Sequence, residues 1–430
     1  MTDRQYGIGT QAGAVFVAAL LLRLLFGFVI VPVFGLQTGP GSREFHTSTD
    51  GYMAVAKNLV EHGVFGFGPD APPTVYRGPG FPMVLAAAYT LIADVGVATV
   101  LVNCVFSAAT CVVILFLSAS LLGRSRALWL TMPAVVFPLS IYYCASSFAD
   151  TFFSFTVVLY IGLLDAMIRR PSPGRGIAHG AAFALTVLTK SILLPFACVV
   201  LVYAAARRAS WFRAAALSTV VGFTLVAPWT WRNYRVSGEW VAVAVGPGFS
   251  MLSGNFMIDA GPDSDDAIRH GEARAFERVN GRHGTAYSRS SLKTAGHWDI
   301  PQDVDRLFKS EAYAMIREQP SLLPRKLLIN AWRFWYFASD VPKCVGNLAV
   351  NYPTLVLAVV ALVPLLRRRD PAVELLVLCT LFILLVYAMV NVSSSRYCLP
   401  TVMLLTPFAA LTVGQWLARR STPAGGGGLW

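Results

Sequence analysis

The sequence predicts an all-α polytopic membrane protein, and three observations support this prediction. Charged residues make up 13% of the chain, about half of the roughly 25% that is usual in soluble proteins. Apolar residues make up 55%, and the mean hydropathy is +0.58. Apolar stretches of about 20 residues, the length that an α-helix needs to cross a bilayer, recur along the 430 residues.

These apolar stretches predict about ten membrane-spanning helices. They lie at approximately 12–34, 96–122, 127–145, 151–168, 176–190, 191–206, 213–231, 350–366, 372–390 and 398–417. The fifth and sixth are short and share one apolar stretch, so we expect them to form a hairpin. The first is followed by no small-residue cleavage site, so we expect a retained helix and not a removed signal peptide.

Arginines occupy alternate short loops between the predicted helices, for example at 124–126, 169–175, 207–213 and 367–369. This distribution follows the positive-inside rule and predicts that both termini are cytoplasmic. It also accounts for the net charge of +12, so we expect the lipid bilayer, and no nucleic acid, to be the partner of the basic residues.

The two long segments on the opposite side predict folded external loops. The expected organisation is helices 1–7 within 1–231, with a first external loop at 35–95, an external loop domain at 232–349, helices 8–10 within 350–420, and a flexible Gly-rich tail at 421–430. In the loops we expect short helices at 52–60 and 81–92 and an amphipathic helix at 304–316. Aromatic residues at 332–337 are typical of the membrane–water interface.

Five charged residues each follow a different odd-numbered predicted span: Asp50, Asp150, Lys190, Arg232 and Arg396. With a cytoplasmic N-terminus, all five lie on the external face. A charge near the hydrocarbon costs roughly 2.5–3.5 kcal/mol even on insertion scales, so such residues often mark a functional site. We expect a polar cavity there, with acids for chemistry and cations for an anionic ligand.

The two acids each admit more than one interpretation. Asp50 follows Thr47-Ser48-Thr49 and precedes a helical pattern, so it is suited to be a helix N-cap, a general base, or both. Asp150 could cap the next helix, orient an acceptor, or hold a divalent cation such as Mg²⁺ or Mn²⁺ together with Asp50. Glu44 is a weaker acid candidate because it lies in an open polar stretch.

The cations likewise have a structural and a functional interpretation. Arg77 lies in a Gly- and Pro-rich turn, which either only redirects the chain or presents a guanidinium to a phosphate. Lys190 could snorkel at the tip of the hairpin, and Arg232 and Arg396 could anchor helix ends. The positive-inside rule disfavours cations in short external loops, however, and an anionic lipid phosphate would explain them.

The remaining motifs say little about function. Arg23, within the first span, would snorkel to the inner interface or contact a lipid phosphate. Cysteines near the external side allow one disulfide, such as Cys344–Cys398. The six histidines show no zinc-type spacing, and there is no phosphate-binding Gly loop and no nucleophile elbow.

Taken in order, these short motifs resemble the C-fold (GT-C) glycosyltransferases, most closely bacterial members grouped with protein O-mannosyltransferases and lipid A aminoarabinose transferases. The resemblance is carried by Asp50 with Tyr52 and Ala56, Arg77 to Pro82, Asp150, Leu188 to Lys190, Pro228-Trp229 with Arg232 to Tyr234, Gly254-Asn255, and Arg396-Tyr397. It spans almost the whole chain.

The resemblance implies a GT-C fold and an inverting transferase that uses a polyprenyl-phosphate sugar such as an undecaprenyl-phosphate donor. The acceptor hydroxyl would belong to a lipid, a cell-envelope glycan or a protein on the external face of a bacterial cytoplasmic membrane. Asp50 would be the general base, with Asp150 as the second catalytic acid. The implied donor-phosphate ligands are Arg77, Lys190, Arg232 and Arg396, and the implied substrate-positioning residues are Tyr52, Tyr76, Asn255 and Tyr397.

One position departs from the family pattern. Many relatives have a second acid directly after the first-loop Asp, whereas Gly51 stands here. The use of a divalent cation therefore stays open, and no other cofactor is expected.

Two other functions compete with the transferase. A transporter or flippase of an anionic polyprenyl lipid would also place cations in a cavity, although broken helices and charges on both faces would be more typical of it. A non-catalytic assembly partner would have no need for Asp50 and Asp150.

Overall fold

A computed structural model describes residues 7–36 and 50–421 of the chain, and it is almost entirely helical. In the N-terminal half the helices are α1 (Ile8–Leu25), α2 (Val31–Val33), α4 (Tyr52–His62), α5 (Gly80–Tyr89), α6 (Val95–Leu122), α7 (Ala127–Val135), α8 (Pro138–Cys144), α9 (Asp150–Arg169), α10 (Pro173–Thr189), α11 (Phe196–Ala206) and α12 (Phe212–Ser237). The C-terminal half contains α13 (Pro247–Met257), α14 (Ser264–His283), the strands β1 (Lys293–Thr294) and β2 (His297–Trp298), α15 (Gln302–Glu318), α16 (Leu322–Arg333), α17 (Val341–Arg367), α18 (Pro371–Val390) and α19 (Leu399–Ser421).

Within the described residues, seven helices are long and apolar enough to cross a membrane, or eight when the bent pair α7–α8 is one span. The expected multi-pass helical architecture is thus present. The predicted hairpin at 176–190 and 191–206 accounts for the difference from ten, because α10 has 17 residues and α11 only 11.

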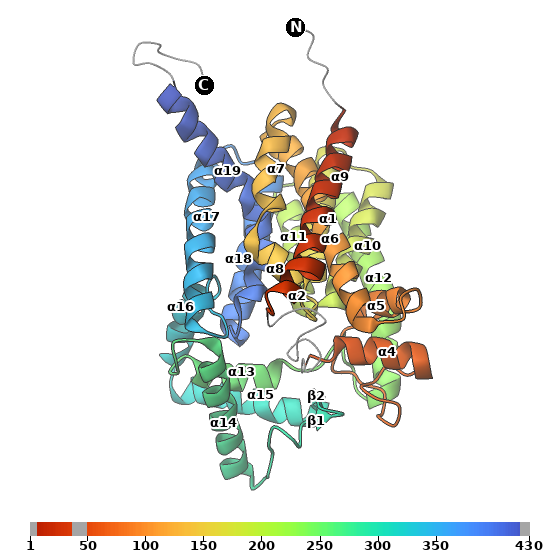
Figure 1. Ribbon diagram of the computed structural model, residues 1–430. Coiled ribbons are helices and arrows are strands. Elements are labelled where there is room, and N and C mark those ends of the chain that lie inside the picture. The colour runs from red at the N-terminus through yellow and green to blue at the C-terminus, as the bar shows by residue number, and fades with distance from the viewer. Residues whose placement is uncertain (1–6, 37–49, 422–430) are drawn as a thin grey trace.

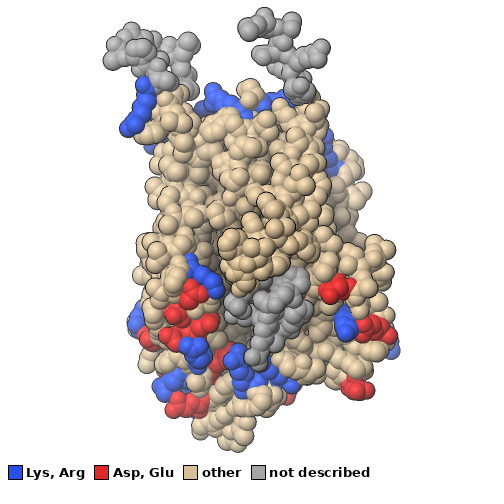
Figure 2. Space-filling model, in the orientation of Figure 1, with Lys and Arg blue, Asp and Glu red and all other residues tan. Residues whose placement is uncertain are grey.

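The long helices stand side by side, and the described N-terminal end of α1 and C-terminal end of α19 lie at the same end of the bundle (Figure 1). Among the spans, α6, α9 and α19 are the most buried, and α17 is the most open, followed equally by α12 and the span that begins with α1. On the face in Figure 2, charged side chains gather at the two ends, and a broad uncharged band lies between them. This band is what a bilayer-spanning protein requires.

The position of Arg23 contradicts the prediction that its side chain reaches the inner interface or a lipid phosphate. Arg23 is fully buried on α1, so it neither snorkels to an interface nor faces lipid. Its guanidinium donates to the carbonyl oxygens of Ala134 and Val135, where α7 ends, and to the hydroxyls of Ser107 and Ser140. The α7–α8 pair bends by 56° at this point, and the bend leaves carbonyls without helical partners. Arg23 satisfies them.

The end of the bundle opposite the described termini carries α4, α5 and the segment α13–α16, with the β1–β2 hairpin beside them (Figure 1). The helix α13 is the centre of this segment. Asp305 accepts hydrogen bonds from the backbone N–H groups of Gly248 and Phe249 at the N-terminus of α13. Arg333 donates hydrogen bonds to the carbonyl oxygens of Met257 and Ala260 at the C-terminal end of the same helix. Both charges complement the helix dipole.

The aromatic residues at 332–337 do not form the expected interfacial cluster as a whole. Trp332 is exposed and packs against Tyr352, but Phe334, Trp335 and Phe337 are buried. These three rings connect the external segment to the helical bundle instead of facing lipid.

The possible disulfide can be compared with the structure, whereas several other predicted features lie outside the described residues. Cys344 and Cys398 are both free, and Cys398 instead lies 3.7 Å from the Asn351 amide nitrogen. Glu44 and Thr47 to Thr49 lie outside the described residues, as does the expected flexible tail at 421–430 beyond Ser421.

Candidate functional site

Five charged side chains meet at the end of the bundle that carries α4 and α5. Asp50 precedes α4, and Arg77 lies in the turn before α5. Asp150 is the first residue of α9, Lys190 follows α10, and Arg396 belongs to the short 3₁₀ turn before α19. Five segments far apart in the sequence therefore contribute one residue each, and we call these five the ionic cluster.

The ionic cluster is a chain of alternating charges. The Arg77 Nη2 lies 3.6 Å from Asp50 Oδ1, and the Arg396 Nη1 lies 3.3 Å from Asp50 Oδ2. On its other side, the Arg396 Nε lies 3.5 Å from Asp150 Oδ2, and the Lys190 Nζ lies 2.6 Å from Asp150 Oδ1. Among the residues that the structure describes, three cations thus face two carboxylates, which leaves one positive charge in excess at a largely buried site.

Asp50 is not a helix N-cap, because Gly51 holds that position and no side chain caps α4. Burial opposes ionisation of its carboxyl group, but the positive charges of Arg396, Arg77 and Lys190 outweigh burial and lower the pKa of Asp50. Asp150 is likewise not a cap: it lies one residue inside α9, and its oxygens face Lys190 and Arg396. Both acids are therefore carboxylates held by cations.

The Arg396 guanidinium has an unused donor. Its Nε is buried and makes no hydrogen bond within the part of the chain that the structure describes, although Asp150 Oδ2 lies 3.5 Å away. A buried N–H without an acceptor is costly. An anion that accepted this N–H would therefore be bound favourably.

Aromatic rings surround the three cations. Arg77 lies over the rings of Tyr52 and Tyr76, at 5.3 and 4.6 Å from their centroids. Lys190 and Arg396 each lie 5.4 Å from the centroid of Tyr397. Three of the four predicted substrate-positioning residues thus contact the ionic cluster, and their rings hold the cations by cation–π attraction.

Two glycines explain how Arg77 comes close to Lys190. A Cβ on Gly78 would lie 2.4 Å from the Leu188 carbonyl oxygen, and one on Gly80 would lie 2.5 Å from Thr189 Oγ1. Only a glycine permits so close an approach of two backbones. The turn before α5 is therefore packed directly against the end of α10.

The described residues do not form a good divalent-cation site. No group of three or more His, Cys, Asp and Glu side chains that could hold a metal ion occurs in residues 7–36 and 50–421. Asp50 and Asp150 are bridged by the Arg396 guanidinium, so a metal ion between them would have to displace a permanent cation. We therefore assign no chemical step to a metal.

Two predicted residues lie apart from the ionic cluster. Arg232 donates to the carbonyl oxygens of Thr74 and Phe65, and its guanidinium lies 4.7 Å from the ring centroid of Trp229. Its contacts hold the first external loop to α12. Asn255 is buried on α13, where its side-chain oxygen accepts a hydrogen bond from Lys326 at 2.7 Å.

Sequence analysis missed several residues that shape the site. Phe148 lies under the Arg396 guanidinium, 3.8 Å from its ring centroid, and Tyr387 stacks on Tyr397 at 4.3 Å. The amide of Asn347 donates to the Ser395 hydroxyl at 2.7 Å, next to Arg396. Only Phe148 had a signal in the sequence, because it is two residues before Asp150.

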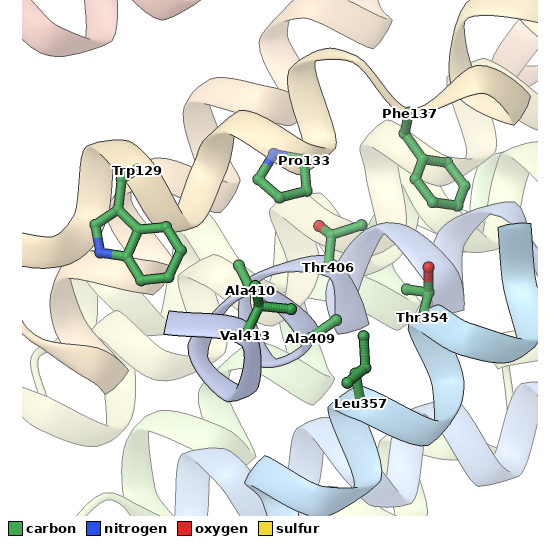
Figure 3. Close-up of a pocket in the computed structure, with 9 residues that line it drawn as sticks. All are labelled: Trp129, Pro133, Phe137, Thr354, Leu357, Thr406, Ala409, Ala410 and Val413. Atoms are coloured by element: carbon green, nitrogen blue, oxygen red, sulfur yellow. The ribbon is translucent and has the colours of Figure 1, made fainter. Parts of the chain in front are cut away.

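An apolar groove lies deeper in the bundle, between α7, α17 and α19 (Figure 3). Its volume is about 240 Å³. Trp129, Pro133 and Phe137 line one side, and residues of α17 and α19 such as Leu357 and Ala410 line the other (Figure 3). Thr406 is ten residues after Arg396 along the same chain segment, or about 15 Å at the rise of an α-helix.

Comparisons with known proteins identify the fold. No protein-family model matches the chain, and no curated protein sequence matches it. The crystal structure of the Archaeoglobus fulgidus oligosaccharyltransferase in its apo form matches with a TM-score of 0.56 and 11% identity, over 95% of this chain and 51% of that one. The same archaeal protein, AglB, in complex with an inhibitory peptide and a dolichol-phosphate, matches with a TM-score of 0.55 and 11% identity, over 97% and 52%.

A looser likeness is to ArnT from Cupriavidus metallidurans bound to undecaprenyl phosphate, with a TM-score of 0.43 and 16% identity over 97% of this chain and 81% of that one. The chain spans about half the length of the oligosaccharyltransferase structures that it matches. The oligosaccharyltransferase matches, with TM-scores of 0.55 and 0.56, show that the chain shares their fold, the GT-C fold.

Proposed function

We propose that this protein is an integral membrane glycosyltransferase that transfers a sugar from a polyprenyl-phosphate donor to an acceptor hydroxyl. The observation that carries the proposal is the ionic cluster, in which a half-buried carboxylate, Asp50, lies between two guanidinium groups. One of these groups, Arg396, has a buried Nε–H that finds no hydrogen-bond acceptor among residues 7–36 and 50–421. The GT-C fold and the dolichol-phosphate complex of AglB support a lipid-phosphate ligand.

The donor phosphate would bind to Arg77, Arg396 and Lys190. These cations now face Asp50 and Asp150, and a phosphate would share them. Its negative charge would offset the attraction that lowers the pKa of Asp50. Donor binding would thus make Asp50 a stronger base at the moment when a base is needed.

The reaction would be a single displacement with inversion. Asp50 accepts the proton of the acceptor hydroxyl, and the acceptor oxygen forms a bond to the anomeric carbon of the sugar. The bond between that carbon and the phosphate oxygen breaks, and polyprenyl phosphate leaves with the bonding electron pair. Arg77, Arg396 and Lys190 stabilise the charge that develops on the phosphate, and Asp150 keeps Lys190 and Arg396 in place.

The surrounding structure fits a lipid donor and an external active site. The apolar groove (Figure 3) would receive the distal part of the polyprenyl tail, while the phosphate remains near Arg396. Arginines at the end of the bundle where the described termini lie favour cytoplasmic termini, with the ionic cluster on the outer face of a bacterial cytoplasmic membrane. The segment 232–349 would cover the sugar and take part in acceptor recognition.

The test is transfer from a panel of undecaprenyl-phosphate sugars in proteoliposomes that contain the full chain. Asp50→Asn keeps the size of the side chain and removes the base, so we expect transfer to fall roughly 10²–10⁴-fold. Binding of undecaprenyl phosphate, measured by microscale thermophoresis, should persist. Asp70→Asn, at an exposed acid of the same loop, is the matched control and should transfer like the wild type.

Two outcomes would contradict the proposal. Full transfer by Asp50→Asn would remove Asp50 from the chemical step and make Asp150 the candidate base. Absence of transfer with every donor, together with movement of a fluorescent polyprenyl lipid across the bilayer, would favour the flippase.

A further inference from the structure

The helix α16 has the opposite polarity to a helix on the surface of a water-soluble protein. Its inward side chains include Lys326 and Asn330, which are 1% and 2% exposed, and Arg333, which is also buried. Leu328 and Trp332, in contrast, are 74% and 56% exposed. Positions two residues apart lie about 200° apart around an α-helix, so the polar side chains form the inner face and the apolar side chains the outer face.

The polar side chains of the inner face are held by the external segment and by the bundle. The Lys326 Nζ donates a hydrogen bond to Asn255 Oδ1 on α13 at 2.7 Å. The side-chain amide of Asn330 donates to the Ala388 carbonyl oxygen, in the last turn of α18, at 2.9 Å. Arg333 binds carbonyl oxygens at the end of α13. These bonds fix the rotation of α16 about its own axis, so its apolar face is held outward.

The outer face of α16 lies next to the exposed side of α17. The two helices meet where the rings of Trp332 and Tyr352 have centroids 4.4 Å apart and the Tyr352 hydroxyl donates to the Trp332 carbonyl oxygen (Figure 1). Large apolar side chains are exposed along α17, among them Val345, Leu348 and Val356, and α17 is the most open of the spans. The apolar surface of this span therefore extends onto α16.

Charged side chains mark where this apolar surface ends. Arg325, three residues before Leu328, is exposed and forms an ion pair with Asp259 at 2.6 Å. Lys343, in the first turn of α17, forms an ion pair with Asp340 at 2.9 Å. Both cations are paired, and side chains of this length can carry a charge from apolar surroundings to the headgroup region. The apolar surface of α16 thus begins after Arg325 and covers the second half of the helix.

A lipid environment accounts for both faces of α16, whereas water accounts for neither. In water, two large apolar side chains would be left exposed while a lysine and an asparagine were buried, and both arrangements cost free energy. At a membrane, polar side chains turn toward the protein interior and apolar side chains face lipid. Because the outer face of α16 is continuous with a span, the bilayer that surrounds the span also covers this face.

We propose that the second half of α16, together with the first turns of α17, is inserted into the membrane leaflet on the side of the ionic cluster. The partner of this surface is lipid, with acyl chains against Leu328 and the Trp332 ring at the membrane–water interface. The segment 232–349 is then anchored to the bilayer near its C-terminal end. This inference does not depend on the proposed reaction, and it can be measured without catalysis.

Spin labelling of the full chain in liposomes of phosphatidylethanolamine and phosphatidylglycerol tests this proposal. Cys198→Ser first removes the exposed cysteine, and a nitroxide is then attached at Leu328→Cys, Trp332→Cys or Val345→Cys. Power-saturation EPR compares the access of oxygen, which concentrates in lipid, with the access of a water-soluble nickel complex, Ni(II)-EDDA. Glu277→Cys, at an exposed side chain of α14, is the control.

The labels at Leu328 and Val345 should be several-fold more accessible to oxygen than to the nickel complex, and the label at Glu277 should show the reverse. Trp332→Cys supplies a second position on the outer face of α16 and should agree with Leu328→Cys. Access of the nickel complex to both α16 labels equal to that at Glu277 would overturn the proposal, even with a lipid signal at Val345, because α16 would then lie in water. Spectral broadening of the Leu328 label that disappears on dilution with unlabelled protein would also overturn it, because a second copy of the chain would then cover this face.

Discussion

Two arginines of this protein, the fully buried Arg23 and the largely buried Arg396, differ in the groups that their guanidiniums face. Arg396 faces carboxylates, with Asp50 Oδ2 at 3.3 Å and Asp150 Oδ2 at 3.5 Å. Arg23 faces neutral oxygens: the carbonyls of Ala134 and Val135 and the hydroxyls of Ser107 and Ser140. Each guanidinium lies in a predominantly apolar bundle, but their surroundings serve different purposes.

The comparison shows which surroundings allow a cation inside the bundle to bind a ligand. The Arg396 Nε–H makes no hydrogen bond to any residue that the structure describes, and the partners of the guanidinium are anions that a phosphate could replace. Arg23 has its donors occupied by atoms of a helix bend, and an incoming phosphate would leave those carbonyls unsatisfied. The first arrangement suits ligand binding, whereas the second suits structure alone.

The largest expected effect comes from removing the charge of Arg396. Arg396→Gln should lower kcat/KM roughly 10²–10³-fold, because one donor to the developing charge is lost and Asp50 and Asp150 lose their bridge. The assay is transfer in proteoliposomes with a fixed donor. Arg306→Gln is the control, since Arg306 is exposed and pairs with Glu239 away from the ionic cluster. An unchanged kcat/KM in Arg396→Gln would place the phosphate elsewhere.

Arg23→Met should have the opposite profile, with a loss of stability and little change in activity per folded molecule. We expect the free energy of unfolding to fall by roughly 2–5 kcal/mol, because the Ala134 and Val135 carbonyls become buried without a donor. Denaturation in mixed micelles, followed by tryptophan fluorescence, measures this change. Arg126→Met, at an exposed arginine directly before α7, should leave stability unchanged. If the Arg23→Met variant were stable but inactive, Arg23 would act in function and not only in stability, which would contradict the distinction between the two arginines.

The contrast also shows what the sequence could predict. Asp50, Asp150, Lys190 and Arg396 were expected on one face because each follows an odd-numbered apolar span, and topology alone brings such positions together. The same rule misplaced Arg232, because α12 continues to Ser237 and carries Arg232 within the helix. There its side chain binds carbonyls of the first loop.

The roles of Arg23 and Lys326 could not be predicted from the sequence, because most of their partners are distant in the sequence and half of these are backbone atoms. The carbonyls that Arg23 binds exist as acceptors only because α7 and α8 are bent apart more than 100 positions later. The acid expected after Asp50 in relatives is replaced by Gly51, and the reason became visible only when Phe67 and His297 were found against it. Local pattern does not encode such contacts.

The smallest expected effect concerns Lys326, which is also the most specific test of the comparison. Like Arg23, it is a buried cation with neutral partners, the Met251 carbonyl and the Asn255 side-chain oxygen, at 3.2 and 2.7 Å. Unlike an arginine, it can lose its charge, and burial lowers its pKa from 10.5 to about 7. An exposed lysine in the unfolded chain keeps a pKa near 10.4.

Between pH 7 and about 10.5 the unfolded chain therefore binds a proton that the folded chain does not, so the stability contributed by this site rises with pH and is lost as pH falls toward 7. Lys326→Met should raise the melting temperature near pH 7 and flatten its rise up to pH 10, as measured by tryptophan fluorescence in micelles. Arg325→Met, at the exposed neighbour on α16 that pairs with Asp259, should follow the wild-type pH curve. If the curve of Lys326→Met runs parallel to that of the wild type instead, Lys326 stays charged in the folded protein, and neutral partners alone then suffice to hold a buried cation, as they do for Arg23.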